Sequence, residues 1–222
     1  MNEKMIAAVM KGEAETVKNL LNAGADPNAM TEDNMTALMI AVWLGQKDIA
    51  TLLLEKDAKA DIQDESGYTA LMFACNKGYS EIVKILLNAK ANANIKDIYG
   101  STALMFASEA GNTDLLQLLI KANAEIDAKD NDGKTALRQA SINGHTETVQ
   151  LLLSAGANPN IQDHYGRTAL MSASMNGHTQ VVKDLINAGA DVNIKDNEGE
   201  TALDDAEFND NTEIIALLKS AK

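Results

Sequence analysis

Residues 64–96 read DESGYTALMFACNKGYSEIVKILLNAKANANIK, and this stretch decides the fold. Asp64 and Gly67 are the first and fourth residues of a pattern that favours a type I turn. Thr69 then suits the N-cap of a helix, and Gly78 suits the end of a short helix. The stretch therefore predicts a turn, a short inner helix, a longer outer helix and a connecting loop.

The apolar residues of this stretch fall on one face of each predicted helix. Leu71, Ala74 and Cys75 are spaced by three and four residues, which gives the inner helix a narrow apolar face. A wider stripe marks the outer helix, and its members are Ile82, Val83, Ile85, Leu86 and Leu87. Two such helices cannot bury both apolar faces alone, whereas stacked copies can.

The tripeptide Thr-Ala-Leu recurs at a constant interval of 33 residues, starting at positions 36, 69, 102, 135, 168 and 201. A fixed period without insertions is typical of a solenoid, in which each unit contacts its neighbours. We expect one elongated domain over residues 1–222. Its first, capping repeat covers residues 1–30, the full repeats cover 31–63, 64–96, 97–129, 130–162 and 163–195, and the last, capping repeat covers 196–222.

This pattern resembles the ankyrin repeat, whose unit reads roughly D-x-x-G-x-T-P-L-H-x-A-A-x-x-G-H-x-x-V-V-x-x-L-L-x-x-G-A-x-x-N. Residues 163–193, DHYGRTALMSASMNGHTQVVKDLINAGADVN, match it closely. The resemblance covers essentially the whole chain. It implies an all-α ankyrin-repeat solenoid of stacked helix–turn–helix units joined by β-turn or hairpin loops. It also implies a non-enzymatic protein-interaction module.

The chain departs from the family pattern at the Pro and His of the Thr-Pro-Leu-His motif. Ala replaces the Pro throughout, and the inner helix should survive because Ala is the strongest helix former. The His is replaced by Met39, Met72, Met105, Arg138, Met171 and Asp204. We expect thioether packing to replace the polar links that His would make between neighbouring turns.

A third departure concerns the Gly that ends the outer helix. It is present as Gly24, Gly156 and Gly189, but Asp57, Lys90 and Asn123 stand at its place in the central repeats. If the backbone there is left-handed, Lys90 destabilises the fold by about 1 kcal/mol.

The last repeat is unusually acidic, with Asp204, Asp205 and Glu207 on its inner helix. A terminal repeat needs one polar face because no further repeat packs on it. We interpret these carboxylates as that polar face rather than as a cation site, since they lack the alternating ligands of a calcium loop.

Composition limits the classes of partner. The formal net charge of −13 disfavours nucleic acid and anionic membranes. The single cysteine, Cys75, fits a reducing compartment. The sequence starts with a helical pattern, without a signal peptide or a membrane-spanning stretch, so we expect a complete, cytoplasmic and monomeric protein. Lysine far outnumbers arginine, which resembles bacterial ankyrin proteins.

The sequence offers no set of residues for catalysis, and we expect no enzymatic activity, no metal and no cofactor. It contains none of the common phosphate-binding, zinc or nucleophile motifs. His145 and His178 occupy the same repeat position and should be structural, and His164 lies in a turn. Cys75 stands where other repeats carry small residues, which indicates a buried core position.

In ankyrin proteins the concave face, here called the inner face, typically binds the partner. It comprises the turn tips and the exposed side of the inner helices. Trp43 and three of the four tyrosines fall at such positions, and aromatic residues supply most binding energy at protein interfaces. Phe208 falls there too. The predicted binding residues are Met35, Trp43, Leu44, Tyr68, Lys77, Ile98, Tyr99, Glu109, Lys134, Ile142, Tyr165, Arg167 and Met175.

An alternative interpretation is that the turn tyrosines only stack between repeats and bind no partner.

A further alternative function is regulation of a partner enzyme or binding of a small ligand, in a pocket between repeats near Arg138 and Gln139. These two residues replace the Met-Phe pairs of the two preceding repeats. Without such a ligand, Arg138 is expected to face solvent and to contribute to solubility.

Overall fold

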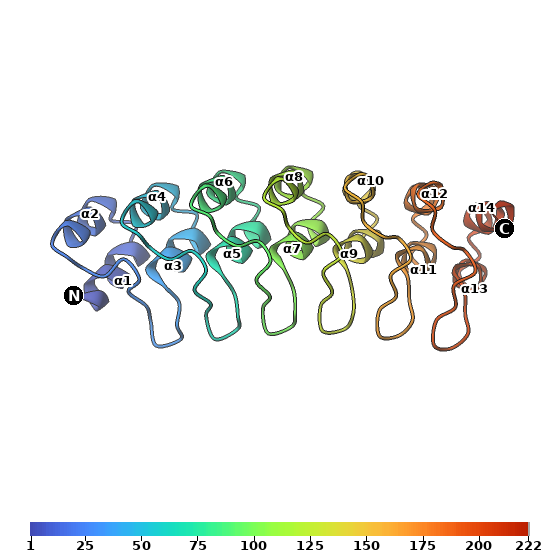
Figure 1. The fold of residues 1–222 in the computed structure, drawn as a ribbon, viewed down its shortest axis with the longest axis horizontal. Helices are drawn as coiled ribbons and strands as arrows, with labels where there is room; N and C mark the ends of the chain where they lie inside the picture. Colours follow the sequence, from blue (N-terminus) through green and yellow to red (C-terminus); the bar gives the residue numbers. More distant parts are fainter. Residues whose placement is uncertain (222) are drawn as a thin grey trace. The chain divides into compact units, whose positions relative to one another are not determined.

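The computed structural model describes residues 1–221 and divides into two compact units. The first unit is Met1–Ala103, and the second starts at Leu104. Both consist of helices that follow one another in pairs (Figure 1), and the described residues contain no strand. The all-α fold class is therefore confirmed, with one isolated bridge between Met30 and Thr36. The single domain and the repeat boundaries stay predictions.

The first unit contains three inner and three outer helices. The inner helices pack on one another in order, as do the outer ones. The inner helices are α1 (Asn2–Met10), α3 (Ala37–Trp43) and α5 (Ala70–Lys77). The outer helices are α2 (Ala14–Asn22), α4 (Lys47–Glu55) and α6 (Ser80–Asn88).

The second unit repeats this arrangement. Its inner helices are α7 (Ala103–Glu109, starting at the last residue of the first unit), α9 (Ala136–Ile142), α11 (Ala169–Met175) and α13 (Ala202–Phe208). Its outer helices are α8 (Thr113–Lys121), α10 (Thr146–Ser154), α12 (Thr179–Asn187) and α14 (Thr212–Ser220). Helices α9, α11 and α13 pack in order, as do the four outer helices.

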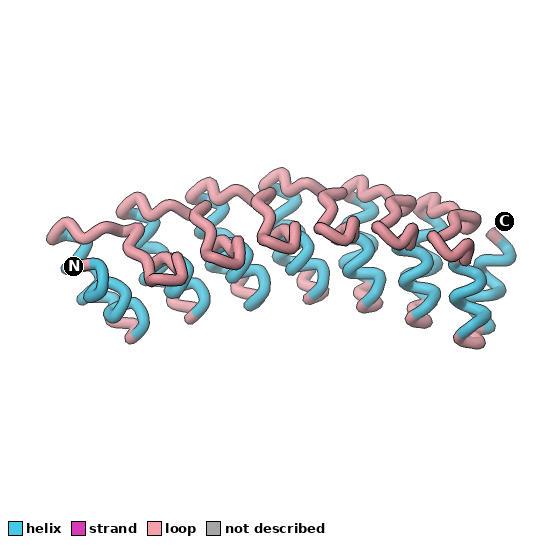
Figure 2. The backbone as a smooth tube through the Cα atoms, turned by 90° about the horizontal axis from the view of Figure 1, so that it is seen from below, coloured by secondary structure: helices cyan, strands magenta, loops and turns pink. Residues whose placement is uncertain are grey.

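Two kinds of connection join the helices within each unit. Long loops precede the inner helices and extend away from the outer ones (Figure 1). Figure 2 shows these loops at one end of the helices and short connections at the other. Each inner helix after α1 therefore begins near a turn tip and ends at a short connection.

The threonine of the Thr-Ala-Leu motif is the N-cap of five inner helices, as predicted, whereas the Thr102 hydroxyl has no hydrogen-bond partner within residues 1–221. Thr69 Oγ1 accepts from the Met72 N–H at 3.3 Å, and the Met72 sulfur accepts from the Thr69 N–H at 3.5 Å. The same reciprocal pair joins Thr168 and Met171. Methionine at the family's His position therefore closes the first turn of its own helix, a role that the sequence pattern did not predict.

The Asp-x-x-Gly turns also form as predicted. Asp64 Oδ1 accepts from the N–H groups of Ser66 at 2.9 Å and Tyr68 at 2.8 Å, and Gly67 takes a φ of 78°. A Cβ on Gly67 would lie 2.8 Å from the Asp97 Cα of the next turn. Glycine is required here because it permits both the positive φ and the close approach of two turns.

The apolar stripe of the outer helix faces the core. Ile82, Val83 and Leu86 of α6 are buried, whereas Ile85 and Leu87 at the edges of the stripe are half-buried. The equivalent Val149 and Leu152 of α10 are also buried in the second unit. Stacked helix pairs thus bury the faces that a single pair would leave exposed.

The outer helices are followed by a left-handed residue in each unit, including at the positions that lack Gly. Asp57, Lys90 and Asn123 have φ values of 63°, 67° and 60°, close to the 85–93° of Gly24, Gly156 and Gly189. The backbone strain predicted for Lys90 is therefore present.

Candidate functional site

Four predicted binding residues of the first unit expose large apolar side chains, at two places of its inner face. Trp43 and Leu44, at the end of α3, are 48% and 41% exposed. Ile98 and Tyr99, at a turn tip, are 55% and 66% exposed. These four residues were all predicted as binding residues, and their side chains are accessible to a partner.

The other predicted residues of the first unit contact their neighbours. The Lys77 ammonium lies 5.7 Å from the Trp43 ring centroid, a distance typical of a cation–π contact. Tyr68 is half-buried, and its ring centroid is 5.1 Å from that of Phe73. Met35 is half-buried as well. Packing therefore holds Trp43 and Tyr68 in place, which lowers the entropy that binding would remove.

In the second unit, Tyr165 is the most exposed of the predicted residues that the sequence placed at turn tips, at 63%. Lys134 is half-buried and pairs with Asp132 at 2.8 Å. Glu109 is exposed at the end of α7, and Ile142 and Met175 are half-buried at the ends of α9 and α11.

Arg138 is buried, and the expectation that it faces solvent is wrong. Only 8% of the residue is exposed, and its Nη2 lies 3.0 Å from the Asp163 carboxylate of the next turn. Burial lowers the pKa of Arg138, and the charge of Asp163 opposes this shift. The ion pair between Arg138 and Asp163 is thus a polar link between neighbouring turns, where the sequence pattern predicted packing without such links.

The small-ligand pocket near Arg138 and Gln139 stays a prediction. The guanidinium is committed to Asp163, although its Nε and Nη1 are buried without a hydrogen-bond partner among residues 1–221. Gln139 is half-buried. A thermal-shift screen with metabolites, repeated on Arg138→Ala, tests this alternative, since only a shift that the substitution abolishes supports it.

Arg167, predicted at the rim of the binding surface, lies in a second ion-pair network. Its Nη1 is 3.2 Å from Asp196, and its Nη2 is 2.7 Å from Asp205. Burial alone would lower the pKa of Arg167, but the hydrogen bond and charge of Asp205 raise it above its ordinary value. This side chain mainly links turns, and only 20% of it is exposed.

The acidic residues of α13 separate into two roles. Asp205 is only 2% exposed and pairs with Arg167, so its assignment to the polar outer face is wrong. Asp204 and Glu207 are exposed, as predicted. Asp204 Oδ2 accepts from the Thr201 N–H and Oγ1–H, both at 2.7 Å, and these hydrogen bonds lower the pKa of Asp204.

The two histidines at the same repeat position are structural, as predicted. His145 Nε2 lies 2.9 Å from the Glu109 carbonyl, and His178 Nε2 lies 2.9 Å from the Ile142 carbonyl. A carbonyl only accepts, so each Nε2 carries the proton and donates. Each ring also packs on a glycine of the preceding repeat, where a Cβ on Gly144 would approach His178 to 2.5 Å.

The side chains that could bind a metal or act as a nucleophile form no cluster within residues 1–221. Cys75 is fully buried, and burial raises the pKa of its thiol to about 12. Within residues 1–221, no three His, Cys, Asp or Glu side chains come together as a metal site. No helix in that range is long and apolar enough to cross a membrane.

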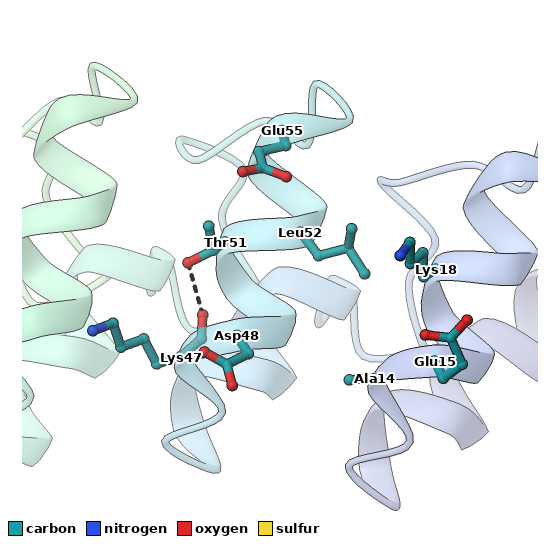
Figure 3. Close-up of a pocket in the computed structure, with 8 residues that line it drawn as sticks. All are labelled: Ala14, Glu15, Lys18, Lys47, Asp48, Thr51, Leu52 and Glu55. Atoms are coloured by element: carbon teal, nitrogen blue, oxygen red, sulfur yellow. Dashed lines mark hydrogen bonds between the residues drawn. The ribbon is translucent and has the colours of Figure 1, made fainter.

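The first unit also has a surface hollow of about 490 Å³ between α2 and α4 (Figure 3). Glu15 and Lys18 line it from α2, and Lys47, Asp48 and Glu55 line it from α4. All five are exposed. The hollow lies on the outer helices and combines charges of both signs, so it presents no organised set of catalytic groups.

Two exposed apolar residues of this face were missing from the predicted set. Met10 ends α1 and is 57% exposed, and Phe208 ends α13 and is 82% exposed. Both stand at the position of Trp43, separated from it by whole multiples of the 33-residue period. The sequence pattern already placed Phe208 on this face, and counting back one period from Trp43 finds Met10.

Comparison with known proteins agrees with this architecture. The family model described as ankyrin repeats, in three copies, matches residues 5–97, 89–163 and 155–222. The chain is an ankyrin-repeat protein. Ankyrin repeats generally mediate protein–protein interaction, and proteins of this family typically have no enzymatic activity.

A solved structure shows the same ankyrin-repeat fold. The crystal structure of the ankyrin repeat domain of Bcl-3, a unique member of the IkappaB protein family, has a TM-score of 0.87 and 30% sequence identity. The alignment covers 97% of each chain. No curated protein matches the chain in sequence.

Proposed function

We propose that this ankyrin-repeat protein is a non-enzymatic interaction module that binds a partner protein through its inner face. The proposal rests on one observation. Large apolar side chains stand exposed on the turn tips and inner-helix ends of both units, above all Trp43, Tyr99 and Tyr165.

Each of these residues suits a binding surface physically. Tryptophan and tyrosine provide large contact areas with few rotatable bonds, and they dominate the energy of many interfaces. Aromatic residues form only 4% of the chain, so four large exposed ones at turn tips and inner-helix ends, with Phe208 as the fourth, form a distinctive feature. In the first unit the exposed Leu44 and Ile98 extend the apolar surface, and Lys77 is a charged rim residue. Glu109 has the same role in the second unit.

The partner on this proposal is a protein, bound by a monomeric cytoplasmic chain without a metal or cofactor. Nucleic acid and anionic membranes fit poorly because the net charge of −13 repels phosphate groups.

Affinity capture from the native host tests the proposal. Wild type is compared with Trp43→Ala/Tyr68→Ala/Tyr99→Ala and with Trp43→Ala/Tyr99→Ala, which keeps the Tyr68–Phe73 contact. A matched control, Glu81→Ala/Lys84→Ala, alters exposed residues of the outer helix α6. Partners should be lost from both inner-face variants and kept by the control. Equal capture by all four proteins would contradict the proposal.

A further inference from the structure

The second unit carries an apolar row at one repeat position, the last residue of successive inner helices. Ile142 ends α9, Met175 ends α11 and Phe208 ends α13. Phe208 is 82% exposed, and the other two are half-buried. These helix ends lie beside the short connections (Figure 2). The row Ile142, Met175 and Phe208 therefore presents one apolar side chain per repeat.

Polar contacts to the next repeat fix the register of this row. The Ile142 carbonyl accepts from His178 Nε2 at 2.9 Å, and the Met175 carbonyl accepts from Asn209 Nδ2 at 3.1 Å. Glu109, which precedes the row at the same position, accepts from His145 in the same way. Because the helix ends at Ile142 and Met175 are tied to the following repeat, this part of the row is preorganised.

An asparagine follows each residue of the row and caps its helix. Asn143, Asn176 and Asn209 each donate from Nδ2 to the carbonyl four residues earlier, at 3.1, 2.8 and 3.2 Å. A carbonyl requires the amide nitrogen as its partner, which leaves each Oδ1 to accept. Within residues 1–221 no donor reaches these three oxygens, and all three residues are exposed. One free acceptor per repeat thus runs beside the apolar row.

The charge of this unit favours a basic occupant. The residues from Leu104 onwards include 18 acidic and 9 basic residues, a net charge of −9, against 14 and 10, or −4, in the first unit. Exposed acids lie at both ends of the row, with Glu109 before it and Glu207 and Asp210 around Phe208. Glu207 is partly neutralised by Lys219 at 2.9 Å. A positively charged segment would be attracted along the row.

The spacing of the row favours an extended chain. Packed helices lie about 8–10 Å apart, which sets the distance between successive row residues. A polyproline II helix repeats every three residues and rises about 9.3 Å in doing so. A segment in that conformation brings every third side chain to successive repeats, and its backbone N–H groups are free to donate because the helix has no internal hydrogen bonds.

We propose that the row and its asparagines bind an extended, basic segment of a partner protein that has an apolar residue at every third position. The apolar residues contact Ile142, Met175 and Phe208. Backbone N–H groups of the segment donate to Oδ1 of Asn143, Asn176 and Asn209. This inference rests on the proposed interaction function and specifies the chemistry of the partner.

The first unit provides a matched control surface. Met10 and Trp43 occupy the position of the row, but Lys11 and Leu44 follow them instead of asparagine. The same peptide should therefore bind the first unit without the asparagine contacts, and substitutions there should matter less for it.

A fluorescence-anisotropy titration of the full chain tests the proposal with synthetic peptides. The probe has repeated Leu-Pro-Lys units, and its control has the same composition with the leucines at irregular spacing. An acidic control replaces Lys by Glu. The periodic basic peptide should bind at least about tenfold more tightly than either control, since losing one well-buried contact changes affinity by about that factor. Equal affinities for the two basic peptides, or no binding of either, would overturn the proposal.

Variants locate the binding. Three variants of the row should each lower the affinity for the periodic peptide by about tenfold or more. They are Phe208→Ser, Met175→Ala/Phe208→Ala and Asn143→Ala/Asn176→Ala/Asn209→Ala. The control variant Met10→Ala/Trp43→Ala should change this affinity little. Phe208→Ser keeps the test valid if the asparagine variant unfolds, because this side chain is largely exposed. If the Phe208 and Met10/Trp43 variants weaken binding equally, the proposal fails. If capture of the partner depends on Trp43 and not on the row, this proposal fails while the proposed interaction function stands.

Discussion

Residues 1–103 and the unit that starts at Leu104 share one helical repeat but differ at one position, where Arg138 of the second unit replaces a methionine. In the first unit, Met72 closes its own helix turn, and the Asp97 carboxylate of the following turn makes no ion pair within residues 1–221. The buried Oδ2 atoms of Asp97 and Asp163 both lack a hydrogen-bond partner in that range, so the ion pair is what distinguishes the two positions. In the second unit, Arg138 takes the place of the methionine and pairs with Asp163. The same backbone therefore accommodates either a methionine or an ion-paired arginine at this position. Where the ion pair forms, losing one partner leaves the other as an unpaired buried charge.

Asp163→Asn should give the largest effect on stability. It removes the charge that pairs with the buried Arg138, and breaking a buried ion pair costs about 3–5 kcal/mol. Asp64→Asn is the control, because Asp64 makes the same two turn hydrogen bonds but no ion pair within residues 1–221. It should cost less than about 1 kcal/mol. Urea denaturation followed by circular dichroism measures both, and similar losses would remove the distinction between the units.

A double-mutant cycle of Arg138→Met with Asp163→Asn should show a coupling energy of about 1–3 kcal/mol. The single changes each leave a buried polar partner, whereas the double change removes both charges. The matching cycle in the first unit, Met72→Leu with Asp97→Asn, has no charge pair to lose and should be additive within about 0.5 kcal/mol. Additivity in both cycles would show that Arg138 and Asp163 do not stabilise each other.

Lys90→Gly should stabilise the protein by about 1 kcal/mol, because Lys90 holds a left-handed backbone that glycine adopts without strain. The reverse change in the second unit, Gly156→Lys, should destabilise it by a similar amount. No atom lies within 4 Å of a Cβ placed on Gly156, so the backbone conformation alone is tested. Melting temperatures of the two variants and wild type test this prediction. An unchanged or lowered melting temperature for Lys90→Gly would contradict the predicted strain at Lys90.

Cys75→Ser should have the smallest effect, under about 1 kcal/mol near neutral pH. At the same repeat position Ser108 and Ser141 donate to the carbonyl four residues earlier at 2.8 Å, and a serine at 75 can do the same.

The same variant carries a pH signature. Burial raises the pKa of the Cys75 thiol from 9.0 to about 12, so the folded protein keeps a proton that the unfolded chain loses above pH 9. Wild type should therefore lose stability as pH rises through this range, beyond the loss seen in Cys75→Ser. Below pH 9 the two pH profiles should run parallel. Identical slopes above pH 9 would show that the thiol is accessible.

Much of the fold could be predicted because the 33-residue period fixes each position's role. The caps at Thr69 and Thr168, the left-handed Lys90 and the buried Cys75 all follow from local sequence. The sequence did not reveal which side chains find partners in the next repeat. The Arg138 pattern predicts a solvent-facing side chain, whereas its partner Asp163 lies 25 residues later, in a turn that also binds its own backbone N–H groups.

The candidate site could be predicted only in part, for the same reason. Exposure of Trp43, Tyr99 and Tyr165 follows from their repeat positions, and the structure places them accordingly. Arg167 has the same kind of position, but its long side chain reaches two carboxylates of the last repeat. Position within the repeat therefore predicts where a Cβ points more reliably than where a long charged side chain ends.

Photo-crosslinking in host extract tests the central claim most directly, namely that the inner face binds a partner protein. A photoreactive amino acid replaces Tyr165 at a turn tip or, as the control, Gln180 on the outer helix α12. Both positions are exposed. We expect a discrete adduct with a partner protein from position 165 and none from position 180. Adducts from position 180 alone, or of equal yield from both, would contradict binding through the inner face.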